Sequence, residues 1–397
     1  MEKKNQVPKY PPLRFPEFTD EWKEVKLGEV TSERNETNTP TLPLLSITAN
    51  KGVIPQTDSE KKDVSNADKS KYKRICSGDI GYNTMRMWQG RSALSFIEGI
   101  VSPAYTIVTP LKGVSPLFLS YLIKRPRLIY EFWTHSQGLV EDTLNCKYKD
   151  FAQITITIPS LSEQRKIAAL LSLIDERIEV QNAIIKEREA QKAALLRRLF
   201  DRTLRFPEFT DEWKKVKLGE VAEIIGGGTP STTTTNYWDG EIVWFNPSEI
   251  GKKKYVSNSN RTISFQGLSN SGARLLPKGT VLLTTRATIG EIAIANVECT
   301  TNQGFQSVVT GHEANNEYVY YFLSTQKVYL LRHSSGSTFL ETPSSVIRNL
   351  PLRLPSLPEQ KKIAALLSAI DERLDVERAY AEQLKLQKAY LLRQMFI

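Results

Sequence analysis

The chain repeats two long segments of its own sequence. Residues 14–30, RFPEFTDEWKEVKLGEV, return at residues 205–221 as RFPEFTDEWKKVKLGEV, with 16 of 17 positions matching at a shift of 191 (205 − 14). Residues 161–177, LSEQRKIAALLSLIDER, return at residues 357–373 as LPEQKKIAALLSAIDER, with 14 of 17 matching at a shift of 196 (357 − 161). Such a repeat indicates two copies of one unit, each with a near-constant start, a divergent middle and a near-constant end.

Composition narrows the class of protein. The 397 residues suffice for two or three domains, and 40% hydrophobic with 24% charged residues is ordinary for a folded soluble chain. A net charge of +9 favours a polyanionic partner, nucleic acid before membrane, although a merely basic soluble protein is the alternative. No apolar run approaches the roughly 20 residues that span a bilayer. The scattered cysteines Cys76, Cys146 and Cys299 fit a reducing cytoplasm, and residues 1–13 read as a flexible polar leader.

Each near-constant end predicts a long helix of some 37 residues, roughly 55 Å at 1.5 Å per residue. Ser160 with Glu163, and Ser356 with Glu359, fit capping boxes at the helix starts. Apolar residues then follow a coiled-coil seam: Ile167, Leu171, Ile174 and Ile178, with Ile185, Leu195 and Leu199 beyond, in the first copy, and Ile363, Leu367, Ile370 and Leu374, with Ala381, Leu384, Leu391 and Met395 beyond, in the second. We expect the helices to pair antiparallel about a pseudo-two-fold axis, with Gln181, Arg188 and Lys192 fixing register. The alternative is that each seam packs only on its own domain.

The two middles predict similar α+β domains with β-sheet cores. Both contain short β-prone runs between turn residues, and one helical stretch each, at residues 117–132 and 318–331. Landmarks recur at slowly drifting shifts: Gly78 and Gly279 (201), Arg86 and Arg286 (200), and His135 and His333 (198). One fold with small loop insertions explains this drift.

The sequence offers little catalytic chemistry. The run Gly226-Gly227-Gly228 lacks the lysine of a phosphate-binding loop and is better explained as a flexible turn, and residues 246–249, NPSE, lack the aromatic of an adenine methyltransferase motif. No histidine has a metal-ligand neighbour, so no metal site is expected. The repetition of His135 and His333 favours a shared structural hydrogen bond. We therefore expect no catalytic residue.

Side chains suited to DNA are more frequent. Arg, Gln, Asn and Thr can read base edges, and Lys and Arg can hold phosphates, although solvated charge runs are the alternative. The candidate base contacts are Arg86, Gln89, Arg91, Thr285, Arg286, Asn302 and Gln303. The candidate phosphate contacts are Lys69, Lys71, Lys73, Arg74, Lys252, Lys253 and Lys254.

Together these segments resemble the specificity subunit of type I restriction–modification enzymes. The resemblance rests on the RFPEF…EW…LGEV openings, the PSLSEQRKIAALLSLIDER and PSLPEQKKIAALLSAIDER helices, and the LPKGTVLLTTRATIGEIA and NQGF segments, and it covers essentially the whole chain. It implies target recognition domains at residues 14–160 and 204–356, and long spacer helices at residues 161–203 and 357–397. It also implies that each domain reads half of a bipartite DNA target, and that the helices set the gap between the halves.

The resemblance further implies a set of partners. These are double-stranded DNA, two adenine-N6 methyltransferase subunits and the restriction–translocase subunits, with S-adenosylmethionine, ATP and Mg held by the partner subunits and no cofactor on this chain. Because the middles differ, the half-sites should differ and the target should be asymmetric. Two rival classes remain: a fused enzyme with its own methyltransferase, and a scaffold that binds only proteins. Methyl transfer by the isolated chain would identify the first, and absence of salt-dependent DNA binding the second.

Overall fold

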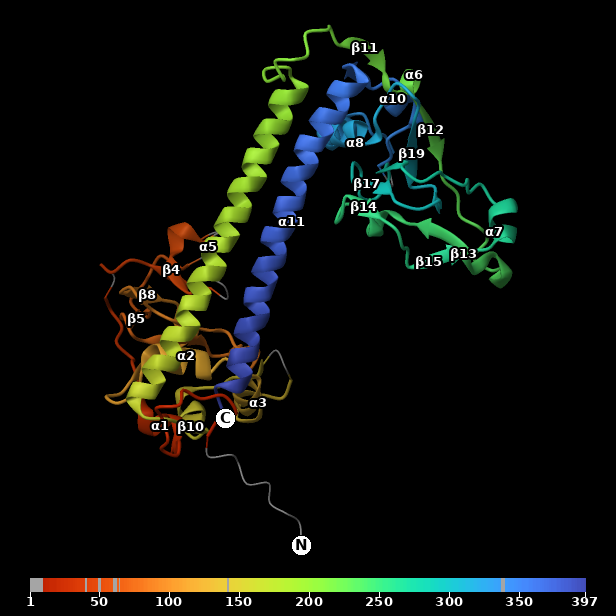
Figure 1. Ribbon diagram of the computed structural model, residues 1–397. Coiled ribbons are helices and arrows are strands. Elements are labelled where there is room, and N and C mark those ends of the chain that lie inside the picture. Colours follow the sequence, from red (N-terminus) through yellow and green to blue (C-terminus); the bar gives the residue numbers. More distant parts are fainter. Residues whose placement is uncertain are drawn as a thin grey trace. The chain divides into compact units, whose positions relative to one another are not determined.

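The chain folds into two compact units (Figure 1). The computed structural model describes residues 10–39, 41–48, 51–59, 63, 65–140, 143–336 and 340–397, so most of the expected leader, residues 1–9, lies outside the described residues. Unit 1 comprises Met1–Asn182 and Ala379–Ile397, and unit 2 comprises Ala183–Arg378. The boundary passes through both long helices, so each unit contains part of both.

Unit 1 is built on an antiparallel four-stranded sheet of order β2-β9-β6-β7, with small sheets β1-β10, β3-β4 and β5-β8 beside it. Helix α2 packs against β7. The elements are β1 (Lys23–Lys26), α1 (Leu27–Val30), β2 (Thr31–Glu33), β3 (Leu45–Ile47), β4 (Val53–Pro55), η1 (Gln56–Asp58), β5 (Lys73–Ile75), β6 (Ile80–Asn83), η2 (Met87–Gln89), β7 (Ser92–Leu94), β8 (Gly99–Val101), β9 (Tyr105–Pro110), α2 (Pro116–Leu122), α3 (Pro126–Thr134), α4 (Tyr148–Phe151), β10 (Thr155–Ile158) and α5 (Leu161–Phe200).

Unit 2 repeats the main sheet and enlarges it. Its order is β12-β19-β16-β17-β14, with a three-stranded sheet β15-β13-β18 and a pair β11-β20. The elements are β11 (Lys214–Lys217), α6 (Leu218–Val221), β12 (Ala222–Gly226), η4 (Thr235–Tyr237), β13 (Trp238–Phe245), η5 (Pro247–Glu249), β14 (Tyr255–Val256), β15 (Arg261–Ile263), α7 (Phe265–Ser269), β16 (Val281–Thr284), β17 (Ile292–Ala295), β18 (Cys299–Thr301), β19 (Phe305–Thr310), α8 (Asn316–Ser324), α9 (Lys327–Arg332), α10 (Ser344–Arg348), β20 (Pro351–Leu354) and α11 (Leu357–Gln394).

The expectation that the two middles share an α+β fold is confirmed. Gly78 and Gly279 both have φ +93°, and their amides donate to Ser95 and Ala295 respectively, which stand 200 residues apart. The candidate loops differ by one residue. The Thr84 amide donates to the Ala104 carbonyl and the Thr285 amide to the Gly304 carbonyl, so Thr84 corresponds to Thr285. The Asn83 and Thr284 amides donate to the carbonyls of Arg91 and Glu291, which stand 200 residues apart, so unit 1 has one extra residue between Thr84 and Arg91.

The helical stretch expected in each middle is interrupted. In unit 1 it divides into α2 and α3 before Pro126, because proline cannot continue the backbone hydrogen bonds and disfavours helix at the preceding residue. In unit 2 it divides into α8 and α9 at Thr325–Gln326, without a proline. The break between the two short helices thus belongs to the shared fold. Only in unit 1 does a proline mark the break in the sequence.

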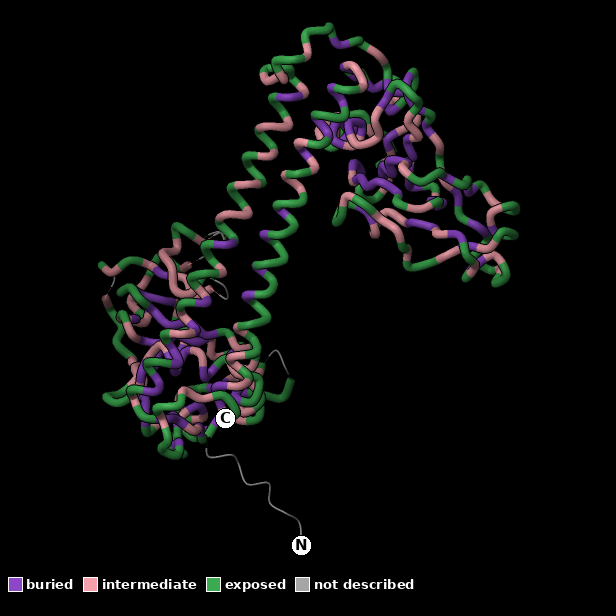
Figure 2. The backbone as a smooth tube through the Cα atoms, in the orientation of Figure 1, coloured by how far each residue is buried: buried purple, intermediate pink, exposed green. Residues whose placement is uncertain are grey.

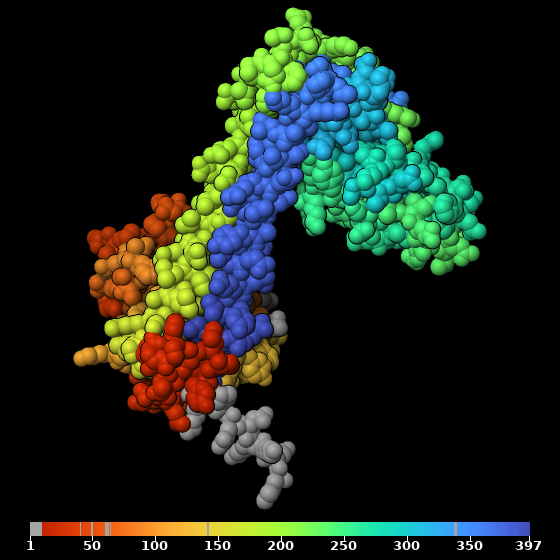
Figure 3. Space-filling model, in the orientation of Figure 1, coloured from red at the N-terminus to blue at the C-terminus, as the bar shows by residue number. Residues whose placement is uncertain are grey.

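The long helices, of 40 and 38 residues, pair antiparallel within each unit. In unit 2, Lys192 pairs with Asp371 and Arg188 with Glu377, so the partner number falls as the other number rises. In unit 1 the equivalent lysine, Lys388, pairs with Asp175, the residue equivalent to Asp371. The two helices therefore exchange roles between the units. Figure 3 shows the helices in contact in both units.

The apolar seam also contributes to the domain cores. Buried positions recur along both helices (Figure 2). Ile167 and Leu171 belong to the core cluster of unit 1, which also contains Met395 and Phe396 from the end of the chain. Ile363 and Leu367 take the same place in unit 2, beside Leu199 and Phe200. Ile174 and Leu374 are buried, and Ile178 and Ile370 are half-buried. The helix starts therefore pack on their own domain and on the end of the other helix.

The near-constant segments meet around a buried carboxylate. Arg14 binds Glu163 through Nε and Nη2 at 2.8 and 2.7 Å, and Trp22 Nε1 donates to the same carboxylate at 3.2 Å. Arg205, Trp213 and Glu359 repeat this arrangement in unit 2. The expected capping box is therefore wrong in part: the Glu163 side chain binds Arg14 and Trp22, although the Glu163 amide still donates to the Ser160 hydroxyl oxygen at 3.4 Å.

Candidate nucleic-acid interface

In unit 1 the candidate base contacts lie on the loop between β6 and β7. Met87 is buried and anchors the loop, whereas Arg86, Gln89 and Arg91 are exposed. Arg86 Nη1 lies 3.4 Å from Gln89 Oε1, and Gly90 closes the turn with φ +72°. An exposed arginine and glutamine on one anchored turn can offer donors and acceptors to base edges.

The equivalent loop of unit 2 is arranged differently. Thr285 is fully buried, and its hydroxyl donates to the Gly304 carbonyl at 3.3 Å, so its side chain supports the loop and is not exposed. Arg286 pairs with Glu341 at 2.7 Å and keeps a side-chain exposure of 41%. Ala287 has φ +58°, a conformation that is uncommon for residues other than glycine.

Asn302 and Gln303 lie beside the glycine run. Gln303 is exposed and accepts a hydrogen bond from the Thr229 hydroxyl at 2.5 Å, while Asn302 Oδ1 accepts the Gly304 amide at 2.8 Å. A Cβ on Gly227 would lie 2.2 Å from the Asn302 carbonyl oxygen, and Gly228 is as close to the backbone of Gly272. The glycines therefore permit close backbone packing, which corrects the expectation of a flexible turn.

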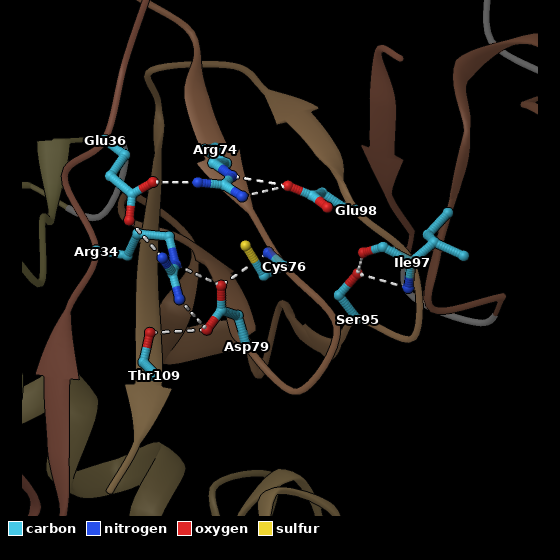
Figure 4. Close-up of polar contacts among 9 residues, drawn as sticks. All are labelled: Arg34, Glu36, Arg74, Cys76, Asp79, Ser95, Ile97, Glu98 and Thr109. Carbon is cyan, nitrogen blue, oxygen red and sulfur yellow. Dashed lines mark hydrogen bonds and ion pairs between the residues drawn. The ribbon is translucent and has the colours of Figure 1, made fainter. Parts of the chain in front are cut away.

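Of the basic run in unit 1, Arg74 is already paired with carboxylates (Figure 4). It binds Glu36 at 2.7 Å and Glu98 at 2.5 Å, and Glu36 also pairs with Arg34. Arg34 in turn binds Asp79, a carboxylate with 2% side-chain exposure. The Arg74 guanidinium is thus part of a chain of ion pairs, and two carboxylates offset its charge.

Asp79 is the buried end of that chain. Its carboxylate accepts hydrogen bonds from the Cys76 amide at 2.8 Å and the Thr109 hydroxyl at 2.7 Å, as Figure 4 shows. Burial raises the pKa of the neighbouring Cys76 thiol, so this cysteine is not an activated nucleophile.

The candidate lysines of unit 1 differ in the contacts that their ammonium groups make. Lys69 donates to the Ser65 hydroxyl and the Asn66 carbonyl and lies 4.9 Å from the Tyr72 ring, and Lys71 is exposed. Lys73 lies 3.9 Å from Glu33.

In unit 2, Lys252 and Lys253 are exposed, but Lys254 is held against the domain. Its ammonium donates to Glu317 at 3.0 Å, to the Tyr321 hydroxyl at 3.2 Å and to Ser368 at 2.6 Å. This lysine connects the segment before β14 to α8 and α11, and its geometry serves structure.

The histidines have the structural role expected from their repetition. His135 Nδ1 lies 2.9 Å from the Glu131 carbonyl, and His333 Nδ1 lies 2.8 Å from the Tyr329 carbonyl. Each ring thus closes the end of its short helix. Within the described part of the chain, no cluster of three or more His, Cys, Asp or Glu could hold a metal ion. In the same described residues, no helix is long and apolar enough to cross a membrane.

Sequence reasoning missed two lysines. Lys147 and Lys149 line a pocket of about 460 Å³ in unit 1, together with the candidate Lys73 and with Thr84 and Met85 at the base of the candidate loop. Between 62 (147 − 85) and 76 (149 − 73) positions of sequence separate the two lysines from these neighbours, so no local pattern marks them. The available signal was only that their counterparts in the second copy are not lysine.

Comparison with known proteins identifies the family. The family model described as the type I restriction modification DNA specificity domain matches residues 19–190 and 210–386, most of the chain. The chain therefore belongs to the type I restriction–modification specificity family and contains two DNA specificity domains. This agrees with the resemblance seen in the repeated segments.

Individual relatives of the chain are named as specificity subunits. The chain is 36% identical over 190 residues to the type I restriction enzyme MjaIX specificity subunit of Methanocaldococcus jannaschii, covering 47% of this chain and 44% of that protein. It is 24% identical over 353 residues to the putative MjaX specificity subunit of the same organism, covering 83% and 80%.

Solved structures share the fold. A chain from a study of complex assembly and conformational transition of the type I R-M system gives a TM-score of 0.59 at 22% identity, covering 94% of this chain and 97% of that one. The type I restriction–modification S subunit from M. genitalium also gives 0.59, at 15% identity, covering 98% and 99%.

Proposed function

We propose that this chain is the DNA-recognition subunit of a type I restriction–modification complex, and that each unit reads one half of a bipartite, asymmetric DNA target. The near-constant segments, residues 14–30 and 161–177 in unit 1 and 205–221 and 357–373 in unit 2, form a frame that repeats. The observation that supports the proposal most is the contrast between this frame and the loops that it presents. Arg14–Glu163 and Arg205–Glu359 make the same contacts in both units. The loops after β6 and β16, in contrast, differ in length and in side chains. One frame with two different surfaces is suited to reading two different sequences.

The base contacts of this proposal are Arg86, Gln89, Arg91 and Gln303, which are exposed, and Arg286 and Asn302, which are half-buried. Phosphate contacts come from Lys69, Lys71, Lys73, Lys252 and Lys253. Thr285 is left out because it is buried. Arg74 is left out because two carboxylates hold it, and Lys254 because three side chains hold it.

The paired helices set the gap between the half-sites and, with the near-identical frame surfaces, dock two methyltransferase subunits. Methyl transfer and DNA cleavage belong to the partner subunits, which bind S-adenosylmethionine, ATP and Mg. The complex acts in the cytoplasm. The exposed frame residues that repeat in both units, such as Glu21 and Glu212, support identical partners on the two units.

A helix-length experiment tests this division of labour. Inserting one heptad into each long helix keeps the seam in phase and adds about 10.5 Å, or about three base pairs at 3.4 Å per pair. In selection of bound duplexes from a random pool, the gap should grow by about three base pairs while both half-sites stay the same. A changed half-site, or an unchanged gap, would contradict the proposal. Substituting Glu179→Gln at an exposed helix position is the control and should leave the target unaltered.

A further inference from the structure

A pocket of unit 1 gathers positive charge beside the candidate base-reading loop. It has a volume of about 460 Å³, and its charged lining residues are three lysines, Lys73, Lys147 and Lys149, and one carboxylate, Glu33. Lys73 and Glu33 lie 3.9 Å apart. Among the residues that the structure describes, no carboxylate lies within ion-pairing distance of Lys147 or Lys149. Two lysine charges therefore remain free to attract an anion.

The segment that carries these lysines is fixed to the domain. Tyr148, between them, donates its hydroxyl hydrogen to the Thr31 carbonyl at 2.7 Å, and its ring stacks on Phe151 with centroids 6.1 Å apart. Lys147 and Lys149 are both exposed on either side of this anchored tyrosine. The backbone between the two lysines is thus held in place while their ammonium groups stay accessible.

The pocket also contains an unsatisfied polar atom. Asn145 lines it, and Asn145 Oδ1 is buried with no hydrogen-bond partner among the described residues. Buried acceptors in folded proteins are almost always paired, so a donor such as a water supplies the partner of this atom. A phosphodiester has no hydrogen to donate, so Asn145 Oδ1 can reach a phosphate only through such a water, and the attraction for the anion comes from the lysine charges.

The corresponding place in unit 2 has different chemistry. The Cys146 amide donates to the Thr84 carbonyl and the Thr342 amide to the Thr285 carbonyl, which sets the correspondence at a shift of 196. Asn145 then corresponds to Glu341, which pairs with Arg286 at 2.7 Å. Lys147 and Lys149 correspond to Pro343 and Ser345. Unit 2 thus has two uncharged residues where unit 1 has two unpaired lysines, and an ion pair where unit 1 has Asn145.

We propose that this pocket of unit 1 binds a backbone phosphate of duplex DNA through Lys147 and Lys149, and that unit 2 has no equivalent anchor. The inference rests on the proposed function. Lysine ammonium groups bind phosphate oxygens as point charges and fix the register of a protein on DNA without reading sequence. Met85 belongs both to this pocket and to the loop of Arg86 and Gln89, so an anchored phosphate would place the neighbouring bases at that loop.

The test measures duplex binding by the full-length chain as salt is varied. With Lys147→Ala and Lys149→Ala combined, the slope of log affinity against log salt should become less negative by about 1.8, because each lost phosphate contact contributes about 0.9. Affinity at 0.1 M salt should fall roughly 10- to 100-fold, equally for all target sequences. Lys147→Arg with Lys149→Arg should keep the slope, and Lys186→Ala with Lys361→Ala removes two exposed helical charges as a control.

The outcomes distinguish failure of the proposed function from failure of the phosphate anchor alone. If the wild-type chain shows no salt-dependent duplex binding, the proposed function fails. If it binds and the alanine pair leaves the slope unchanged, only the phosphate anchor fails. Inorganic phosphate, titrated at constant ionic strength, distinguishes the remaining source: phosphate binding that needs both lysines, with an unchanged DNA slope, would make the pocket a free-phosphate site and overturn the anchor.

Discussion

The two units use one frame and differ in what they build on it. In unit 1 a buried ionic group, Asp79 with Arg34, holds the start of β6. Its counterpart in unit 2 is Thr280, whose hydroxyl donates to the Pro277 carbonyl at 2.6 Å. The neighbouring pairings differ in length: β8 pairs antiparallel with β5 over three residues and has one parallel bridge, to Leu44, whereas β18 pairs parallel with β13 over three residues and has one antiparallel bridge, to Leu276.

The frame, in contrast, repeats residue by residue. Glu163 and Glu359 each receive an arginine and a tryptophan from segments some 150 residues away. A buried carboxylate restricts its neighbours strongly, because removal of either partner leaves an uncompensated charge. The surface loops carry no such restriction. This difference explains why the ends of the units stay nearly identical while the middles diverge.

The strongest test of the comparison is to break the frame in each unit. Arg14→Ala and Arg205→Ala should each lower the free energy of unfolding by about 3–5 kcal/mol, because each leaves a buried glutamate without its cation. Urea denaturation followed by circular dichroism measures both variants. The exposed Arg165→Ala should change stability by less than about 0.5 kcal/mol. A cost below about 1 kcal/mol, or very different costs in the two units, would contradict the idea of one frame.

The buried ion pair of Asp79 and Arg34, which only unit 1 contains, should contribute less to the free energy of unfolding. Asp79→Ala should cost about 2–4 kcal/mol, since it removes the carboxylate that pairs with Arg34 and accepts from Thr109 and Cys76. The matched Thr280→Ala should cost about 1 kcal/mol, the value of one neutral hydrogen bond. The same denaturation experiment compares them, and equal costs would show that the two sheet edges are not stabilised differently.

Alkaline pH should lower the free energy of unfolding of both units. Burial, together with hydrogen bonds to Asp175 and Asp371, raises the pKa of Tyr121 and Tyr321 above the ordinary value. The unfolded chain therefore releases these protons first, so stability is complete below about pH 10 and falls as pH rises further. Each tyrosine contributes a slope of up to about 1.4 kcal/mol per pH unit.

Unfolding free energies between pH 8 and 11 measure this slope. Tyr121→Phe and Tyr321→Phe should each reduce it, because each hydroxyl donates to an equivalent aspartate, Asp175 or Asp371. If only one of the two substitutions reduces the slope, the two units differ at this contact.

The smallest expected effect concerns thiol reactivity. Burial raises the pKa of Cys146 and Cys299 to about 12, one cysteine in each unit. Alkylation by iodoacetamide at pH 8 should therefore be at least about tenfold slower in the folded chain than in urea for both residues. Mass spectrometry of the labelled peptides measures this, and fast labelling of either one would indicate local opening of that unit.

The sequence predicts the frame better than the loops. Repetition alone indicates the two units, the long helices and the shared hydrogen bonds of His135 and His333. The partners of Glu163 could also have been inferred, because Arg14 and Trp22 repeat together with it. Contacts that occur in one copy only, such as those of Arg74 with Glu36 and Glu98, have no such signal, since tertiary folding brings their partners together.

The same limit applies to the candidate interface. Thr285 and Lys254 have the right chemistry for DNA, but burial and pairing with Glu317 depend on elements that local patterns do not reveal. Lys147 and Lys149 stand in an unremarkable stretch of sequence and become notable only through the pocket that they share with Met85.

The central claim is that target specificity lies in the parts of the two units that do not repeat. Mapping N6-methyladenine in the source genome, with this chain present and with its gene deleted, tests it most directly. We expect an asymmetric motif of two different half-sites that is methylated only when the chain is present. A methylation pattern unchanged by the deletion, or a motif with two identical half-sites, would contradict it.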